Sequence, residues 1–320
     1  MDRRAFLRYG AAGVLGAAAP ARAQGRPPMR LVVPYPPGGT TDGMARVLAA
    51  SLTRTLNRTV IVDNRSGAAG LLGVRAVQTA APDGSVLLFG NPGMITLALQ
   101  NRAAGFDPVR DFAPVGLVGR SPLFLMVHKG VPARTTAEFV AYAKAVPDGI
   151  NSGSAGLGSN GHITAMLLAR AAGIDITHVA YRGTSEAATA LMAGEVKMQI
   201  NSTTVALNEA LRSGLVRFLA VMTERPTSLA PGVPAIVDTF PDLVVDTWFG
   251  FFGPAGTPPA VIEEVNAALA AALAEPEVRS RFLAGFIEPE HSSPEGMRAA
   301  VAASAAFWAR AFRDLEIAPQ

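Results

Sequence analysis

Two glycine-rich segments carry the residues in this sequence whose types and spacing could bind an anion. In the first, Pro36-Pro37-Gly38-Gly39 is followed by Thr40, Thr41 and Asp42, which are typical residues of a helix N-cap. The first N–H groups of a helix have no partner within the helix, and the helix dipole is positive at this end, so a carboxylate can be held there. The same pattern is also typical of a strand-to-helix connection that binds nothing, and this segment alone leaves both interpretations open.

The second segment, Asn151–His162, also stands between a strand-like and a helical run. Its glycines Gly156, Gly158 and Gly161 match G-x-G-x-x-G, the dinucleotide-binding fingerprint. The acid that binds the ribose should end the following strand, whereas Asp175 begins it, and the unit lies in mid-chain instead of opening a domain. We therefore expect no cofactor, and interpret this segment as a second helix start with free donors.

Catalytic and metal chemistry find little support in the sequence. Ser154 and Ser159 are candidate nucleophiles, but neither has glycine at both the −2 and +2 positions of a nucleophile elbow. The four histidines have no metal-ligand spacing, and His178 is interpreted as a core or cleft-edge residue. We expect a protein that is not an enzyme and has no metal; a periplasmic serine hydrolase using Ser154 or Ser159 is the weaker alternative.

The two segments must be positioned by strands and helices that alternate along the chain. Residues 31–33, 60–62 and 86–89 are apolar runs typical of buried strands, and an apolar residue recurs at every fourth position from Met44 to Leu56, as in an amphipathic helix. Such alternation predicts an α/β protein with parallel strands, whose carboxyl-end loops form the site.

The alternation occurs twice, and the chain is long enough for two domains. We assign residues 24–118 and 223–320 to the first lobe and residues 119–222 to the second, joined by crossovers near 115–127 and 216–222.

The N-terminus has the features of an export signal. Residues 1–23 combine a basic start containing Arg3-Arg4, as in twin-arginine signals, with a short apolar run and a small-residue cleavage site at Ala21-Arg22-Ala23. Either the twin-arginine or the general secretion route would suit, and we expect periplasmic protein that begins at Gln24. This segment holds four arginines and one aspartate, a net +3, so removing it from a chain of net +3 leaves a charge near zero. That balance gives no support to nucleic-acid binding. The absence of cysteine excludes disulfides and thiolate metal sites.

A series of short motifs occurs in order along nearly the whole mature chain. They are Arg30–Gly39 with Asp42 and Ala45-Arg46, Asn64-Arg65-x-Gly67, Ala81–Gly84, Ser152–Ser154 with Gly158-Ser159 and His162, Tyr181–Gly183, Trp248–Gly250, and Pro254–Pro258. In order and spacing this series resembles the periplasmic solute-binding receptors of tripartite tricarboxylate transporters, the TctC or Bug family.

The resemblance implies a two-lobed periplasmic-binding-protein (Venus-flytrap, type II-like) fold that closes on a small carboxylated solute. It implies delivery of that solute to TctA- and TctB-like membrane subunits by a monomer; a sensor or co-receptor for the same solute is the alternative. Carried over by motif, the ligand-binding residues are Tyr35, Gly39, Thr40, Thr41, Asp42 and Asn91 from the first lobe, and Ser154, Gly158, Ser159, Asn160, His162, Arg182 and Asn201 from the second.

Three of these residues need comment. An acid such as Asp42 would repel the ligand unless it faced away from it, and Arg182 either binds a second carboxylate or faces solvent. Asn201 stands where the resemblance leads us to expect an aspartate. A ligand amine would lose its charge partner there, so a plain carboxylate is favoured over an amino acid.

Overall fold

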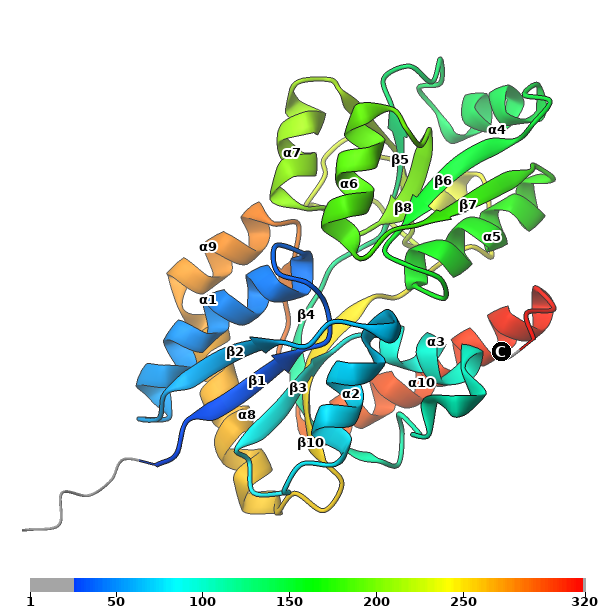
Figure 1. The fold of residues 1–320 in the computed structure, drawn as a ribbon. Coiled ribbons are helices and arrows are strands. Elements are labelled where there is room, and N and C mark those ends of the chain that lie inside the picture. The colour runs from blue at the N-terminus through cyan, green and yellow to red at the C-terminus, as the bar shows by residue number, and fades with distance from the viewer. Residues whose placement is uncertain (1–25, 319–320) are drawn as a thin grey trace, which may run out of the picture.

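The apolar runs expected to form buried strands assemble into two separate sheets in the computed structural model, which describes residues 26–318 (Figure 1). The export segment expected at residues 1–23 lies outside the described residues. The chain forms the first sheet, crosses to the second, and returns to complete the first.

The first sheet has six strands in the order β11-β4-β10-β3-β1-β2. Strand β1 is parallel to β2 and β3, with Leu31 opposite Val62 on one side and Leu87 on the other. Strand β10 runs antiparallel between β3 and β4. The strands are β1 (Met29–Val33), β2 (Val60–Asn64), β3 (Val86–Gly90), β4 (Phe112–Arg120), β10 (Trp248–Pro254) and β11 (Glu288–Pro289).

Helices cover both faces of this sheet. Helices α1 (Thr40–Thr55), α8 (Pro259–Ala274) and α9 (Pro276–Ala284) pack on one face, and α2 (Leu71–Gln78), α3 (Gly93–Gln100) and α10 (Pro294–Asp314) on the other (Figure 1). Short helical turns lie at η1 (Ala68–Gly70), η2 (Arg102–Ala104) and η3 (Ile236–Asp238).

The second sheet has five strands in the order β7-β6-β8-β5-β9. The strands are β5 (Phe124–His128), β6 (Ile150–Ser154), β7 (Ile176–Ala180), β8 (Met198–Asn201) and β9 (Val216–Val221). Helices α4 (Thr136–Lys144) and α5 (Asn160–Ala172) pack on one face, and α6 (Thr184–Ala193) and α7 (Val205–Arg212) on the other. The chain leaves β9 through residues 222–247 and re-enters the first sheet as β10.

Helix α1 has the amphipathic pattern that its sequence predicts. Met44, Leu48 and Leu52 are fully buried against the first sheet. The prediction that Thr40, Thr41 and Asp42 form its N-cap is wrong by one residue, because Gly39 is the N-cap and the helix begins at Thr40. Gly39 takes the extended conformation that an N-cap requires, and the three polar residues occupy the first turn.

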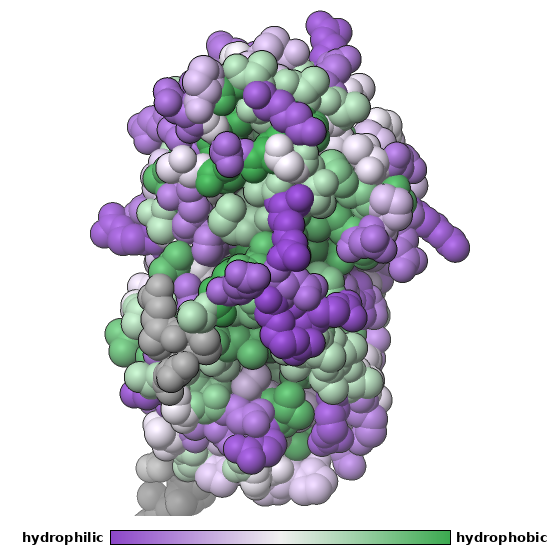
Figure 2. All heavy atoms as spheres, turned by 90° about the vertical axis from the view of Figure 1, so that its right-hand side faces the viewer, coloured by the Kyte–Doolittle hydropathy of each residue, from purple (hydrophilic) through white to green (hydrophobic). Residues whose placement is uncertain are grey.

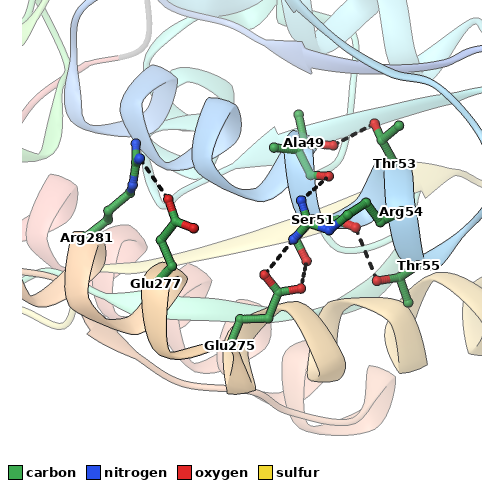
Figure 3. A network of polar contacts seen from close by, with 9 residues as sticks. Ala49, Ser51, Thr53, Arg54, Thr55, Glu275, Glu277 and Arg281 are labelled. Carbon is green, nitrogen blue, oxygen red and sulfur yellow. Dashed lines mark hydrogen bonds and ion pairs between the residues drawn. The ribbon is translucent and has the colours of Figure 1, made fainter.

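A polar cluster fixes the far end of α1 to the junction of α8 and α9 (Figure 3). The buried Ser51 hydroxyl donates to Glu275 Oε1 at 2.6 Å, and Arg54 Nη2 donates to Glu275 Oε2 at 2.7 Å. Together with the apolar stripe, these contacts join α1 to the rest of the first lobe at the end opposite its N-terminus.

Among residues 26–318, no helix has the length and hydrophobicity that crossing a membrane would require. On the face that is turned to the right in Figure 1, hydrophilic side chains project between hydrophobic ones (Figure 2).

Candidate functional site

A cavity of about 750 Å³ lies between the two lobes. It is lined from the first lobe by the loops that follow β1, β2 and β3, and from the second by the loops that follow β6, β7 and β8. These loops stand at the carboxyl ends of strands, where ligands bind in open α/β sheets.

The structure brings most of the expected ligand-binding residues to this cavity. Eleven of them line it: Tyr35, Gly39, Thr40, Thr41, Asp42, Asn91, Gly158, Ser159, Asn160, Arg182 and Asn201. Ser154 and His162 are not among the lining residues and lie behind the second glycine-rich loop, where both are buried.

The first-lobe loop presents the free N-terminus of α1. Gly38 adopts a positive φ of 87°, and its N–H donates to Asp42 Oδ2 at 2.9 Å. Gly39 provides no side-chain cap, so the N–H groups of the first turn, starting with Thr40 and Thr41, are left without a capping acceptor. The loop therefore offers backbone donors and a positive dipole to the cavity.

The Asp42 carboxylate already accepts hydrogen bonds from residues of its own lobe. Besides Gly38, it accepts hydrogen bonds from Arg46 Nε at 3.0 Å and from Asn64 Nδ2 at 3.0 Å. Burial would raise the pKa of Asp42, but the hydrogen bonds from Arg46, Gly38 and Asn64 outweigh burial and lower this pKa. Asp42 is therefore ionised and paired, and its charge is balanced by Arg46.

The second-lobe loop also presents a helix N-terminus, that of α5, which has a side-chain cap. Ser159 is the N-cap and accepts from the His162 N–H at 3.4 Å, which leaves the N–H groups of Asn160 and Gly161 without a cap. The two helix starts, one from each lobe, thus line a single cavity. Next to them, Thr40 Oγ1 donates to the Thr203 carbonyl at 3.0 Å, so the lobes are in direct contact at this edge.

Two stacked histidines support the second loop from behind. The rings of His162 and His178 lie 3.8 Å apart, and His162 Nδ1 accepts from the Gly158 N–H at 3.0 Å. Burial and the nearby His178 lower the pKa of His162 to about 4, so His162 is neutral at neutral pH and free to accept this bond. His162 therefore shapes the loop rather than donating to a ligand.

The structure does not favour Ser154 as a nucleophile, because this side chain is not accessible from the cavity. Ser154 Oγ lies 2.6 Å from His178 Nε2, a contact that resembles half of a catalytic dyad. However, Ser154 is 1% exposed, and its hydroxyl also exchanges hydrogen bonds with Gly156 at 2.9 and 3.1 Å. Ser154 is part of the internal support of the loop and does not face the cavity.

Polar side chains at the strand ends complete the lining. Tyr35 donates from its hydroxyl to Asn91 Oδ1 at 2.9 Å, and burial raises the pKa of Tyr35 to about 12, so it stays protonated. Asn201 is 7% exposed, and its Oδ1 accepts from the Ser202 N–H at 3.1 Å. Asn201 Nδ2 and Asn160 Oδ1 have no hydrogen-bond partner among the described residues. Such buried atoms indicate where a bound polar group would be received.

Arg182 lies at the solvent side of the cavity. Its side chain is 87% exposed and pairs with Glu186 Oε1 at 2.9 Å, four residues along the chain. Of the two roles considered from the sequence, the solvent-facing one agrees with this geometry.

Sequence reasoning missed Thr247, which lines the cavity just before β10. It is 5% exposed, and its Oγ1 has no partner within residues 26–318. Thr247 lies in an irregular segment with no periodicity to mark it; its position next to the Trp248-Phe249-Gly250 motif was the one available signal. Across the same residues, no cluster of His, Asp or Glu could hold a metal ion.

Comparison with known proteins agrees with this geometry. The model of the tripartite tricarboxylate transporter family receptor, TctC, matches residues 44–312. Protein BugT of Bordetella pertussis is 32% identical over 305 residues, which cover 93% of each chain.

Solved structures extend the comparison to the fold. An adipate-bound protein of Rhodopseudomonas palustris, Rpa4515, superposes with a TM-score of 0.87 at 32% identity, covering 92% of this chain and 99% of that one. Malate-bound MatC from the same organism superposes with a TM-score of 0.84 at 30% identity, covering 89% of this chain and 99% of that one. The periplasmic binding protein BugD superposes with a TM-score of 0.86 at 29% identity, covering 92% of this chain and 99% of that one. These neighbours confirm the two-lobed fold that the sequence predicts, and the family is one of periplasmic solute-binding proteins, not enzymes. The chain therefore belongs to the TctC, or Bug, family of tripartite tricarboxylate transporter receptors.

Proposed function

We propose that this protein captures a carboxylated metabolite in the cleft between its lobes and delivers it to the membrane subunits of a tripartite tricarboxylate-type transporter. The observation that carries the proposal is the meeting of two helix N-termini, α1 and α5, at one cavity that Asn201 also lines; Asn201 Nδ2 has no hydrogen-bond partner among the described residues. The carboxylates bound by Rpa4515 and MatC, adipate and malate, support the same ligand chemistry.

The proposed carboxylate site, which we call the seat, lies between the N-termini of α1 and α5 and requires no cationic side chain. A carboxylate between the helices would accept from the N–H groups of Thr40 and Thr41 on one side and of Asn160 and Gly161 on the other, with both helix dipoles favourable. Asn201 Nδ2 would add one neutral donor. Because the donors come from both lobes, the ligand itself links the lobes and favours the closed arrangement.

Closure would provide the signal for delivery. In this proposal lobe 1 (residues 24–118 and 223–320) and lobe 2 (residues 119–222) move about the crossovers, and the hydrogen bond between Thr40 and the Thr203 carbonyl forms on closing. The exported protein, cleaved after Ala23, acts as a monomer whose closed form is recognised by the membrane subunits. Light scattering of the mature protein measures its oligomeric state, and a stable dimer would contradict the monomer.

Thr41→Glu tests the seat. The new carboxylate would occupy the place where the first turn of α1 awaits an anion, so we expect calorimetry to detect no binding of the acid that copurifies with the native protein. Ala137→Glu is the matched control, because Ala137 is exposed and holds the same position, the second residue, in α4. An acid in the first turn of a helix is not harmful to the helix itself.

Thermal unfolding checks that Thr41→Glu still folds, since Thr41 is buried. Mass spectrometry of the native protein identifies the acid. Unchanged affinity of a folded Thr41→Glu protein would place the seat elsewhere, and equal binding of the acid and its neutral amide would contradict a carboxylate receptor.

A further inference from the structure

The second-lobe half of the seat is a short loop with an unusual backbone conformation. Residues 155–159 line the cavity and lead into α5. Gly156 and Gly158 have positive φ values of 131° and 74°, a region that residues other than glycine rarely adopt. Because glycine is also free to take up other conformations, contacts from outside the loop are needed to fix these two residues.

The Ser154 hydroxyl determines which nitrogen of His178 carries the ring proton. Ser154 Oγ donates to the Gly156 carbonyl at 2.9 Å, accepts from the Gly156 N–H at 3.1 Å, and lies 2.6 Å from His178 Nε2. A hydroxyl has one proton, and here the Gly156 carbonyl receives it. The contact with His178 is then a hydrogen bond only if Nε2 carries the ring proton and donates it to Ser154. A ring nitrogen that carries a proton cannot take one from Ser154, so this tautomer does not suit a serine hydrolase.

His162 fixes the second glycine of the loop and has the same tautomer. Its Nδ1 accepts from the Gly158 N–H at 3.0 Å, so the proton of the neutral ring is on Nε2. The His162 and His178 rings are stacked, with centroids 3.8 Å apart and planes inclined by 26°. Burial lowers the pKa of both rings, which keeps them neutral at neutral pH. His178 therefore supports the loop at two points, through Ser154 at one glycine and through His162 at the other.

We propose that His178, as its Nε2–H tautomer, is a positioning residue for ligand binding. His178 lies on β7 and does not line the cavity, so it acts on the seat through the residues that it contacts. The proposal rests on the carboxylate-receptor function and deepens it, because the loop that His178 supports leads into the N-terminus of α5. Without His178, the N–H groups of Asn160 and Gly161 would no longer be held where they meet those of α1.

The tautomers can be measured without any ligand. Long-range ¹H–¹⁵N NMR spectra of the mature protein, assigned with single-histidine variants, distinguish a proton on Nε2 from one on Nδ1. We expect both His162 and His178 to be neutral Nε2–H rings at neutral pH. A His178 ring that carries its proton on Nδ1 overturns the inference, because it could not donate to Ser154.

His178→Leu removes the ring donor and keeps an apolar side chain of similar bulk. We expect the amide protons of Gly156 and Gly158 to exchange with solvent about tenfold faster or more, since one lost buried hydrogen bond is enough for such a change. Calorimetry with malate, with adipate and with the acid that copurifies should show affinity for the cognate acid falling by about tenfold or more. His178→Gln is the conservative variant, because its amide can donate to Ser154, and it should recover the slow exchange of Gly156.

Ser154→Ala has a closely matched control on the same strand. Ser152 and Ser154 both lie on β6 and are each 1% exposed, but Ser152 Oγ has no hydrogen-bond partner among the described residues. Ser154→Ala should weaken binding by about tenfold, and Ser152→Ala should leave the affinity unchanged. Because His178 acts partly through Ser154, the double variant Ser154→Ala/His178→Leu should lose less than the two single losses combined. Fully independent losses, or equal losses in Ser152→Ala and Ser154→Ala, overturn the inference.

Thermal unfolding shows whether each variant is folded. A folded His178→Leu protein that is less stable but binds as tightly as wild type would make His178 a structural residue only, and the inference would be wrong. The proposed function fails in a different way. If wild type binds none of the carboxylates while the tautomers and the exchange rates are as expected, the carboxylate receptor is wrong, whereas His178 still positions the loop.

Discussion

Replacing Asn201 by aspartate should convert a neutral strand end into a repulsive one. In the present structure Asn201 is one of the lining residues; its Oδ1 accepts from the Ser202 N–H at 3.1 Å, while its buried Nδ2 has no partner within the described residues. In Asn201→Asp the first oxygen keeps its donor, but the second becomes a buried acceptor with no donor, close to the ligand carboxylate.

The magnitude follows from that loss. A buried polar group that is left without its partner costs about 1–3 kcal/mol, so the dissociation constant of a plain carboxylate should rise by roughly 5- to 150-fold. The same aspartate would pair with an ammonium group, so an amino-bearing ligand should gain relative to its unaminated counterpart. The opposite charges would then lie in a poorly solvated site, where their attraction is stronger than in water.

Calorimetry with matched pairs measures both effects. Succinate with aspartate, and 3-phenylpropionate with phenylalanine, differ within each pair in the ammonium group alone. Asn151→Asp is the control. It is the same amide-to-carboxylate change, but Asn151 is exposed on β6 and does not line the cavity. If wild type and Asn201→Asp rank the pairs identically with equal affinities, Asn201 does not contact the ligand and the reasoning is refuted.

Three further predictions concern the fold and export. In Gly161→Ala the new Cβ would lie 2.1 Å from the backbone oxygen of Ile200. Denaturant titration should therefore show that the free energy of unfolding falls by about 1–3 kcal/mol. Gly43→Ala is the control and should show no loss, because a Cβ at Gly43 has no neighbouring atom within 4 Å. Because the pKa of His162 is lowered from 6.5 to about 4, its contribution to stability is complete above pH 6.5 and is lost as the pH falls toward 4. The loss is up to about 3 kcal/mol, measurable as a steeper acid dependence of unfolding than in a His162→Gln protein. N-terminal sequencing of periplasmic protein should begin at Gln24, and a chain retaining residues 1–23 would contradict export with cleavage.

Local sequence determined the elements around the site. The prolines and glycines after Val33 end β1, because they lack donors or tolerate positive φ, and the apolar repeat from Met44 buries one face of α1. These signals depend on neighbours within one or two turns, so they can be read without the fold. The motif series added the family, which the comparisons confirm.

The precise role of each polar residue was harder to predict. Ser154, Ser159 and His162 lie within nine residues of one another and look alike as donors, yet Ser154 and His162 are buried and contact His178, which lies on a neighbouring strand. Asp42 is held away from a ligand partly by Asn64, at the end of β2. Such partners are set by strand pairing, which a local pattern does not specify.

The tertiary structure alone decided where the two helix starts meet and what surrounds them. Thr40 and Thr203 are separated by 163 positions and are joined by a hydrogen bond only because the chain crosses twice between the lobes. Thr247 enters the cavity from an irregular segment on the second of these crossings. The sequence by itself determined the two glycine-rich helix starts, the strands and helices around them, and the family. Their meeting at one cavity depends on how the two lobes pack, because contacts between distant residues follow from sheet order and chain crossing and leave no periodicity in the sequence.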